Sequence, residues 1–88
     1  MQSQTQDVLI QYVNRIHEIY GSELKAVILY GSYARGDYTE SSDIDIMILV
    51  DSTEDTIKQK GRMVSDITFD FNLDDDIMIM PIVKNVKH

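Results

Sequence analysis

Cysteine is absent from the 88-residue sequence, and proline occurs once. Without cysteine the chain forms neither disulfides nor thiolate metal sites, which fits a reducing compartment. No apolar run approaches the roughly 20 residues that a membrane-spanning helix needs. The amino-terminal MQSQTQDV also lacks the basic and apolar regions of a signal peptide. We therefore expect a cytoplasmic protein with no membrane partner.

Basic residues are scarce, because 8 Lys and Arg stand against 15 Asp and Glu and leave a net charge of −7. Such a surface repels phosphate backbones, so direct nucleic-acid binding is not expected. The acids are unevenly placed: residues 37–55 contain seven carboxylates and no Lys or Arg. This segment is either a solvated loop with strand ends or a cation site, and composition alone does not choose between them.

The length of the chain limits its organisation. We expect a single domain over residues 1–88. A chain this short buries only roughly 60–65% of the surface that it exposes when unfolded. Hydrophobic residues make up 43%, which favours a globular fold over disorder. The small core and an apolar last strand also favour association, either with a partner or with further copies of the chain.

The hydrophobic pattern predicts an α/β (α+β) fold with a three-stranded mixed sheet flanked by two main helices, in the order α-β-β-α-β. The crossover between the second and third strands favours a parallel relation for that pair. Because proline cannot donate to a ladder, Pro81 is expected near a strand end or on an edge. The expected elements are a helix from Ser3 to about Gly21, strands over 24–30, 43–50 and 77–83, a helix over about 54–72, and a turn over 72–76.

Local signals support these helices. Gly21 is well placed to end the first helix in a left-handed conformation, and Ser52 or Thr53 can cap the second. The expected apolar residues of the first helix are Leu9, Tyr12, Val13, Ile16, Ile19 and Tyr20. Those of the second are Ile57, Met63, Val64, Ile67 and Phe71.

The second strand begins with two acids in DIDIMILV. In a strand, residues i and i+2 face the same side with Cα atoms about 6.5–7 Å apart, so Asp43 and Asp45 present two carboxylates together. Ile44 and Ile46 turn the other way, into the core. Like charges at the start of a buried strand repel, and desolvation penalises both. A divalent cation removes that conflict, and Mg²⁺ prefers such oxygen ligands.

A glycine-serine turn precedes this pair by ten residues. Gly31 follows an apolar strand and permits a sharp turn with close approach of a ligand, and Ser32 adds a hydroxyl. With the amides that follow, this segment can cradle an anion. The sequence therefore predicts a phosphate-holding turn beside two metal-binding acids, which is what transfer from a nucleoside triphosphate requires.

The stretch LYGSYARGDYTESSDIDIMILV resembles the DNA polymerase beta-like nucleotidyltransferases, and in particular the minimal nucleotidyltransferases (MNT). That resemblance implies Mg²⁺-dependent transfer of AMP from ATP, with two ions expected. It implies that Gly31 and Ser32 hold the triphosphate and that Asp43 and Asp45 bind metal. It also implies a HEPN-domain toxin as partner, with a tyrosine hydroxyl as acceptor in a toxin–antitoxin pair.

The resemblance requires a third carboxylate on a neighbouring strand. Asp76, expected to open the third strand, is the first choice, and Asp70, Asp74 and Asp75 are competitors. Arg35 either contacts phosphate or forms a surface salt bridge with Asp37.

Two other classes of function remain open on the sequence. The chain could be a binding module that neutralises a toxin by covering it, with the nucleotide site as a remnant. It could also be a metal-binding or nucleotide-sensing domain within a larger assembly.

Overall fold

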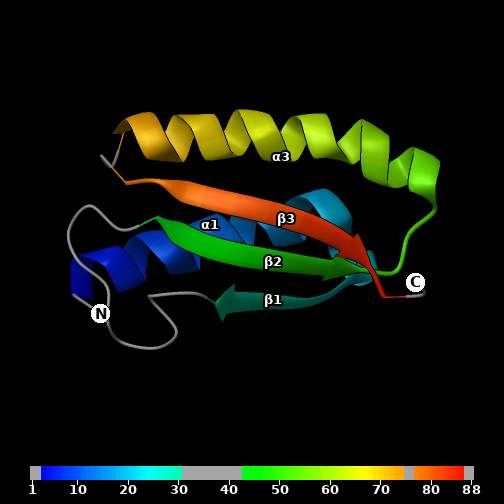
Figure 1. Cartoon of the computed structure of the whole chain (residues 1–88), viewed down its shortest axis with the longest axis horizontal. Coiled ribbons are helices and arrows are strands. Elements are labelled where there is room, and N and C mark those ends of the chain that lie inside the picture. The colour runs from blue at the N-terminus through cyan, green and yellow to red at the C-terminus, as the bar shows by residue number, and fades with distance from the viewer. Residues whose placement is uncertain (1–2, 31–42, 75–76, 87–88) are drawn as a thin grey trace.

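A computed structural model describes residues 3–30, 43–74 and 77–86 of the chain. Its elements are α1 (Ser3–Tyr20), the short 3-10 helix η1 (Gly21–Glu23), β1 (Leu24–Tyr30), β2 (Ile44–Val50), α3 (Glu54–Asp74) and β3 (Ile79–Asn85) (Figure 1). The predicted order α-β-β-α-β and the α+β class are confirmed. No helix in this described part is long and apolar enough to cross a membrane.

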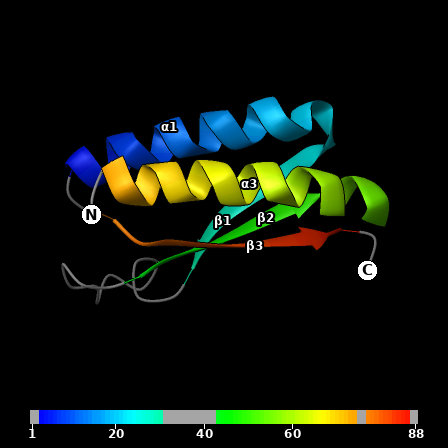
Figure 2. The same cartoon turned by 90° about the horizontal axis from the view of Figure 1, so that it is seen from above.

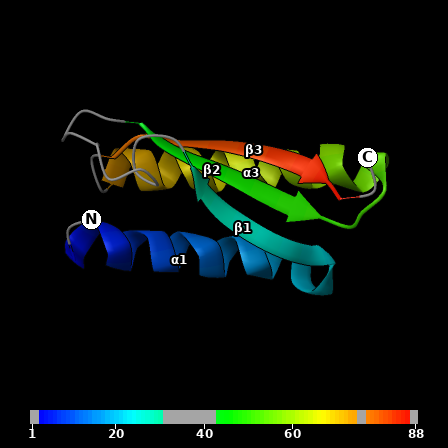
Figure 3. The ribbon, with the colours of Figure 1, turned by 60° about the horizontal axis from the view of Figure 1, so that its bottom comes forward.

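The three strands form one mixed sheet in the order β1-β2-β3. β1 pairs with β2 antiparallel, and β2 pairs with β3 parallel, as the helical crossover predicted. The helices α1 and α3 lie together on one side of this sheet (Figure 2), with α1 beside β1 and α3 behind β3 (Figure 3). The described residues therefore build two layers, helices on sheet, and neither of the two long helices lies on the other face of the sheet.

The core lies between these layers. Alternate residues of the central strand face the helices and are buried, while the residues between them are only half-buried. The buried residues of β2 are Ile44, Ile46, Ile48 and Val50. Both edge strands contribute less, because β1 is half-buried at most and only Ile79 of β3 is fully covered.

The first helix follows its predicted pattern except at Val13, which is only half-buried. Leu9, Tyr12, Ile16, Ile19 and Tyr20 are buried, since a 3.6-residue period brings them to one face. Gly21 has φ of +57°, so it adopts the left-handed conformation predicted for the helix end. The chain then makes one 3-10 turn before β1 begins.

The second helix differs from its prediction on one side. Thr53 caps it as expected, because its Oγ1 accepts a hydrogen bond from the Thr56 N–H at 3.2 Å. Val64 is buried, but the prediction that Met63 belongs to the apolar side was wrong, since 50% of Met63 is exposed. Thr68, a polar residue, takes a place in the core and hydrogen-bonds the Tyr12 hydroxyl of α1 at 2.6 Å.

The third strand begins at Ile79, two residues later than predicted. The predicted turn over 72–76 was also wrong in part, because α3 continues through Asn72 to Asp74. The side chain of Asn72 explains this: its Oδ1 accepts from the Ile79 N–H at 2.8 Å, and its Nδ2 donates to the Ile79 carbonyl at 3.3 Å. Asn72 thus ties the end of α3 to the start of β3. Pro81 lies in this edge strand, as predicted.

Candidate functional site

The two candidate acids lie where the central strand starts. Asp43 directly precedes β2, and Asp45 is its second residue. Because Ile44 and Ile46 face the helices, strand alternation turns both acids to the side of the sheet that carries no helix. Asp45 is half-buried and Asp43 is exposed. The prediction that desolvation penalises both was therefore wrong for Asp43, which remains in solvent.

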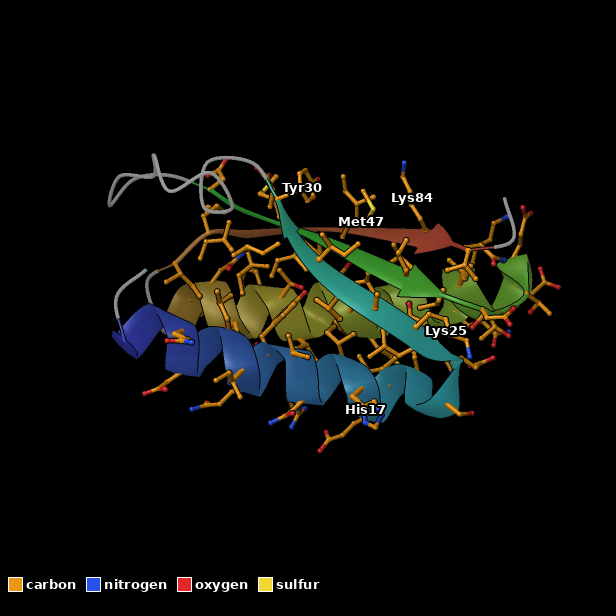
Figure 4. All side chains as sticks on the ribbon, turned by 90° about the horizontal axis from the view of Figure 1, so that it is seen from below. His17, Lys25, Tyr30, Met47 and Lys84 are labelled. Atoms are coloured by element: carbon orange, nitrogen blue, oxygen red, sulfur yellow. The ribbon has the colours of Figure 1, made fainter. Side chains whose placement is uncertain are left out.

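Cross-strand register identifies the neighbours of Asp45. Tyr30 is its partner on β1, and Met80 is its partner on β3. Tyr30 is the last residue of β1 and lies beside Asp45, and Gly31 is joined to it by the next peptide bond. Figure 4 places Tyr30 and Met47 on the side away from the helices. The described sheet therefore places the end of β1 beside Asp45, and Gly31 and Ser32 follow β1 in the sequence.

The three predicted phosphate-binding residues, Gly31, Ser32 and Arg35, lie outside the described residues. Their roles stay predictions from the sequence.

The predicted third carboxylate also falls outside the described residues, since Asp76 belongs to the undescribed pair 75–76. The prediction that Asp76 opens the third strand was wrong, because β3 begins at Ile79. Methionines lie next to the acids instead: Met80 pairs with Asp45, and the Met78 carbonyl accepts from the Ile44 N–H at 2.7 Å. Over the described ranges, no group of three or more His, Asp or Glu could hold a metal ion.

The other described candidates for the third carboxylate lie in the helical layer, away from the acidic pair. Asp70 and Asp74 are exposed residues of α3 and line a groove against α1, together with Arg15. The sheet separates the helical layer from the side on which Asp45 lies (Figure 2). Neither acid shares a face with Asp43 and Asp45, so neither is a third ligand to the same ion in this arrangement.

The donor set fits a hard cation on chemical grounds. Two carboxylates on one face, about 6.5–7 Å apart at Cα, supply oxygen ligands only. Mg²⁺ is commonly held by one or two carboxylates together with substrate phosphates and water. The described residues can thus supply the protein's share of a magnesium–triphosphate site, but they do not supply a third acid.

Three side chains of α1 and η1 have shifted pKa values. Burial raises the pKa of the Tyr12 and Tyr20 phenols in the helical layer. A hydrogen bond from the Lys60 ammonium, at 2.8 Å, lowers the pKa of Glu23 where α3 passes η1. These shifts arise from structural contacts of the helices and of η1.

Sequence reasoning missed Tyr30 and Met80 as the immediate neighbours of Asp45. Tyr30 could have been found, since it ends the strand that precedes Gly31 and an antiparallel return brings it next to the second strand. Met80 could not, because the sequence does not reveal that Asn72 delays the start of β3. An interior acid on that strand would have been a signal, and IMIMPIV contains none.

Comparisons with known proteins agree with this arrangement. A family model described as "Nucleotidyltransferase domain" matches residues 9–88. Several relatives from Methanocaldococcus jannaschii carry the name "Putative protein adenylyltransferase". MJ0141 is 40% identical over 83 residues, which cover 92% of this chain and 82% of the relative. MJ0604 is 56% identical over 41 residues, 47% of this chain and 41% of the relative. MJ1305 is 29% identical over 77 residues, 88% of this chain and 52% of the relative.

No solved structure matches the chain. The chain spans about half or less of the length of two of these three relatives, and most of the length of MJ0141. The family model covers nearly the whole sequence, including the segment from Gly31 to Asp45 that carries the motif. The chain therefore belongs to the nucleotidyltransferase domain family, as its resemblance to the minimal nucleotidyltransferases predicted.

Proposed function

We propose that the chain is an adenylyltransferase that moves AMP from ATP to a hydroxyl group of a protein. One observation carries this proposal: Asp43 and Asp45 lie on the face of the sheet opposite α1 and α3, beside Tyr30, which Gly31 and Ser32 follow in the sequence. The name "Putative protein adenylyltransferase", which the relatives carry, supports the choice of AMP and of a protein acceptor. We place the activity in a single domain of residues 1–88 that acts in the cytoplasm.

In this proposal Asp43 and Asp45 hold Mg²⁺, Gly31 and Ser32 hold the triphosphate, and Arg35 contacts a phosphate. Bound Mg²⁺, with two ions expected, supplies positive charge against the phosphates and the leaving pyrophosphate. Tyr30 and Met80 flank Asp45 on the two neighbouring strands. The two acids thus orient the nucleotide over the start of β2.

The chemical step joins the acceptor oxygen to the α-phosphorus of ATP. The bond between that phosphorus and the bridging oxygen breaks, and pyrophosphate leaves with the electron pair. The hydroxyl proton must pass to a base. We propose Asp76 for this role, because it is the acid closest in sequence to the start of β3, and β3 runs beside Asp45.

We further propose that the acceptor is a tyrosine of a HEPN-domain toxin and that the modification neutralises it. The resemblance of LYGSYARGDYTESSDIDIMILV to the minimal nucleotidyltransferases supports this partner.

The test is transfer of label from [α-³²P]ATP to the candidate partner in the presence of Mg²⁺. We expect label on the partner, pyrophosphate in solution, and loss of both with EDTA or with Asp45→Asn. Asp70→Asn is the matched control, because it removes one exposed carboxylate from the helical layer. Absence of transfer together with absence of ATP and Mg²⁺ binding would refute the proposal.

A second candidate is a binding module that neutralises its partner by complex formation. The observation that favours it is Met80, which occupies the strand position beside Asp45 where an acid would complete a metal site. The double variant Asp43→Asn, Asp45→Asn separates the two functions. If neutralisation survives while transfer is lost, binding suffices. If neutralisation is lost while the complex persists, the chemistry is required.

A further inference from the structure

Among the described residues, the side of the sheet opposite α1 and α3 is rich in exposed apolar side chains. We call it the open face and define it by Ile28 of β1, Asp45, Met47 and Leu49 of β2, and Met80, Ile82 and Lys84 of β3, which register places in neighbouring rows. Ile28, Met80 and Ile82 are 42%, 46% and 43% exposed, and Met47 and Leu49 are half-buried. A sheet with apolar residues on both faces normally has both faces covered. Such a patch marks an interaction surface.

Charge is distributed unequally along this face. Asp45 pairs with Met80 at one end, Met47 pairs with Ile82 in the middle, and Leu49 pairs with Lys84 at the other end. Figure 4 shows Lys84 and Met47 extending from the sheet on the side away from the helices. The row of Asp45 and the row of Lys84 are four positions apart along the strands, which is a distance of about 13 Å. Asp45 and Lys84 of one chain are therefore too far apart to pair with each other.

This pattern is complementary to itself. A two-fold axis in the plane of contact, crossing the strands at the Met47–Ile82 row, reverses the strand direction of a second copy. That rotation lays Met47 and Ile82 of the two copies against each other. It brings Lys84 of each copy over Met80 of the other, beside Asp45. Two-fold contacts of this kind repeat every favourable pair twice.

We propose that the open face is the contact surface of a reversible homodimer in which Lys84 of each copy pairs with Asp45 of the other. The apolar row in the middle supplies the burial, and the two charge pairs fix the direction of the strands. Sheets packed face to face lie about 10 Å apart, a gap that lysine and aspartate side chains can span together.

The size of the face sets the strength of this dimer. Seven residues of strand extend about 23 Å, and three strands about 10–14 Å, so each copy offers on the order of 300 Å² of sheet. A standard stable interface buries about 800 Å² per partner. The dimer is therefore weak and reversible.

Asp45 belongs both to this contact and to the metal site, so dimerisation and binding of magnesium–ATP exclude each other. This consequence rests on the proposed function, whereas the dimer itself does not. The association measurements therefore contain neither nucleotide nor metal, and their outcome is independent of any transfer activity.

The first measurement is sedimentation equilibrium of the wild-type chain from about 10 μM to about 1 mM. We expect a shift from monomer to dimer across this range. A chain that stays monomeric at about 1 mM overturns the proposal, and the open face would then be the contact surface for a different protein. Association beyond a dimer also overturns it, because a closed two-fold contact leaves no face free.

Charge variants test the direction of the contact. Lys84→Glu and Asp45→Lys each weaken association on the order of tenfold, since each breaks two pairs and creates two repulsions. The double variant with both changes restores it, because the pair is re-formed with its signs exchanged. Lys58→Glu, on the exposed surface of α3, makes the same charge change off the face and leaves association unaltered. Failure of the double variant to recover overturns the proposed pairing.

An apolar variant tests the location. Ile82→Glu abolishes the dimer, whereas Phe69→Glu, at a 66% exposed apolar position on α3, does not. Circular dichroism confirms that each variant is folded. If Phe69→Glu disrupts association and Ile82→Glu does not, the helical layer is the interface and the proposal is wrong. Magnesium–ATP added to the wild type shifts the dimer to monomer, and a dimer that persists with nucleotide bound contradicts the shared use of Asp45.

Discussion

The hydrogen bond between Tyr12 and Thr68 joins α1 to α3 inside the core and yields a sharp prediction on stability. The Tyr12 hydroxyl lies 2.6 Å from Thr68 Oγ1, and both residues are buried. Thr68 Oγ1 also donates to the Val64 carbonyl at 2.7 Å. Since that bond uses the only proton of the threonine hydroxyl, the tyrosine must donate to Thr68.

This direction makes the two single variants unequal. Tyr12→Phe removes a donor and leaves Thr68 with its bond to Val64, so we expect a loss of about 0.5–1.5 kcal/mol in the free energy of unfolding. Thr68→Val keeps the shape but strands a buried tyrosine hydroxyl without its acceptor, which costs about 1–3 kcal/mol. The double variant strands no hydroxyl, so its loss is smaller than the sum of the two by about 1 kcal/mol.

Urea unfolding followed by circular dichroism measures all four free energies in one cycle. These effects are a large part of the total stability of a small domain, about 5–15 kcal/mol. Additivity within about 0.3 kcal/mol would refute the reasoning, because it would mean that the two hydroxyls do not interact. A larger loss for Tyr12→Phe than for Thr68→Val would refute the direction of the hydrogen bond.

Three further predictions concern the core, alkaline pH and the site. Ile48→Ala, which empties a fully buried position of β2, lowers the free energy of unfolding by about 2–5 kcal/mol, measured by urea titration. Burial raises the pKa of Tyr12 and Tyr20, so the fold favours the neutral phenols. The stability that these phenols contribute is complete below about pH 10 and is lost as pH rises further. Urea unfolding midpoints measured from about pH 8 to about pH 11 will show this loss. Met80→Asp places a third carboxylate beside Asp45; it destabilises the metal-free fold by about 0.5–1 kcal/mol, and Mg²⁺ reverses the loss in thermal unfolding. Equal thermal stability of this variant with and without Mg²⁺ would show that no ion binds there.

Much of the fold could be predicted from local sequence patterns. The 3.6-residue spacing of Leu9, Tyr12 and Ile16 sufficed for α1, and the alternation in DIDIMILV placed Ile44 in the core and Asp45 on the other face. These predictions succeeded because the period of a helix or a strand is a property of consecutive residues.

The end of α3 and the start of β3 could not be predicted in the same way. They depend on Asn72, whose side chain bonds the backbone of Ile79 seven residues later. The sequence predicted Asn72 to be a turn residue, because asparagine commonly occurs in turns. Tertiary contact overrode that preference and moved the strand by two residues.

The candidate site could likewise be predicted only in part from the sequence. Its acids follow from strand alternation, whereas Tyr30 was missed as their neighbour, because the antiparallel pairing of β1 with β2 was not predicted. Its third carboxylate depends on the register between β2 and β3, in which Met80 rather than an acid lies beside Asp45. Register is set by long-range pairing, so no local pattern could reveal it.

Paramagnetic broadening by Mn²⁺ tests the central claim, that the acids at the start of β2 bind a metal–triphosphate on the helix-free face. Mn²⁺ takes the same oxygen ligands as Mg²⁺ and broadens the amide signals of residues near it. With ATP present, we expect broadening at Tyr30, Asp45 and Met80, and sharp signals at Val50 and Ile16, which lie at the far end of β2 and in α1. Asp43→Asn with Asp45→Asn should abolish the effect. Broadening centred on Asp70 and Asp74, or no broadening at all, would contradict the account.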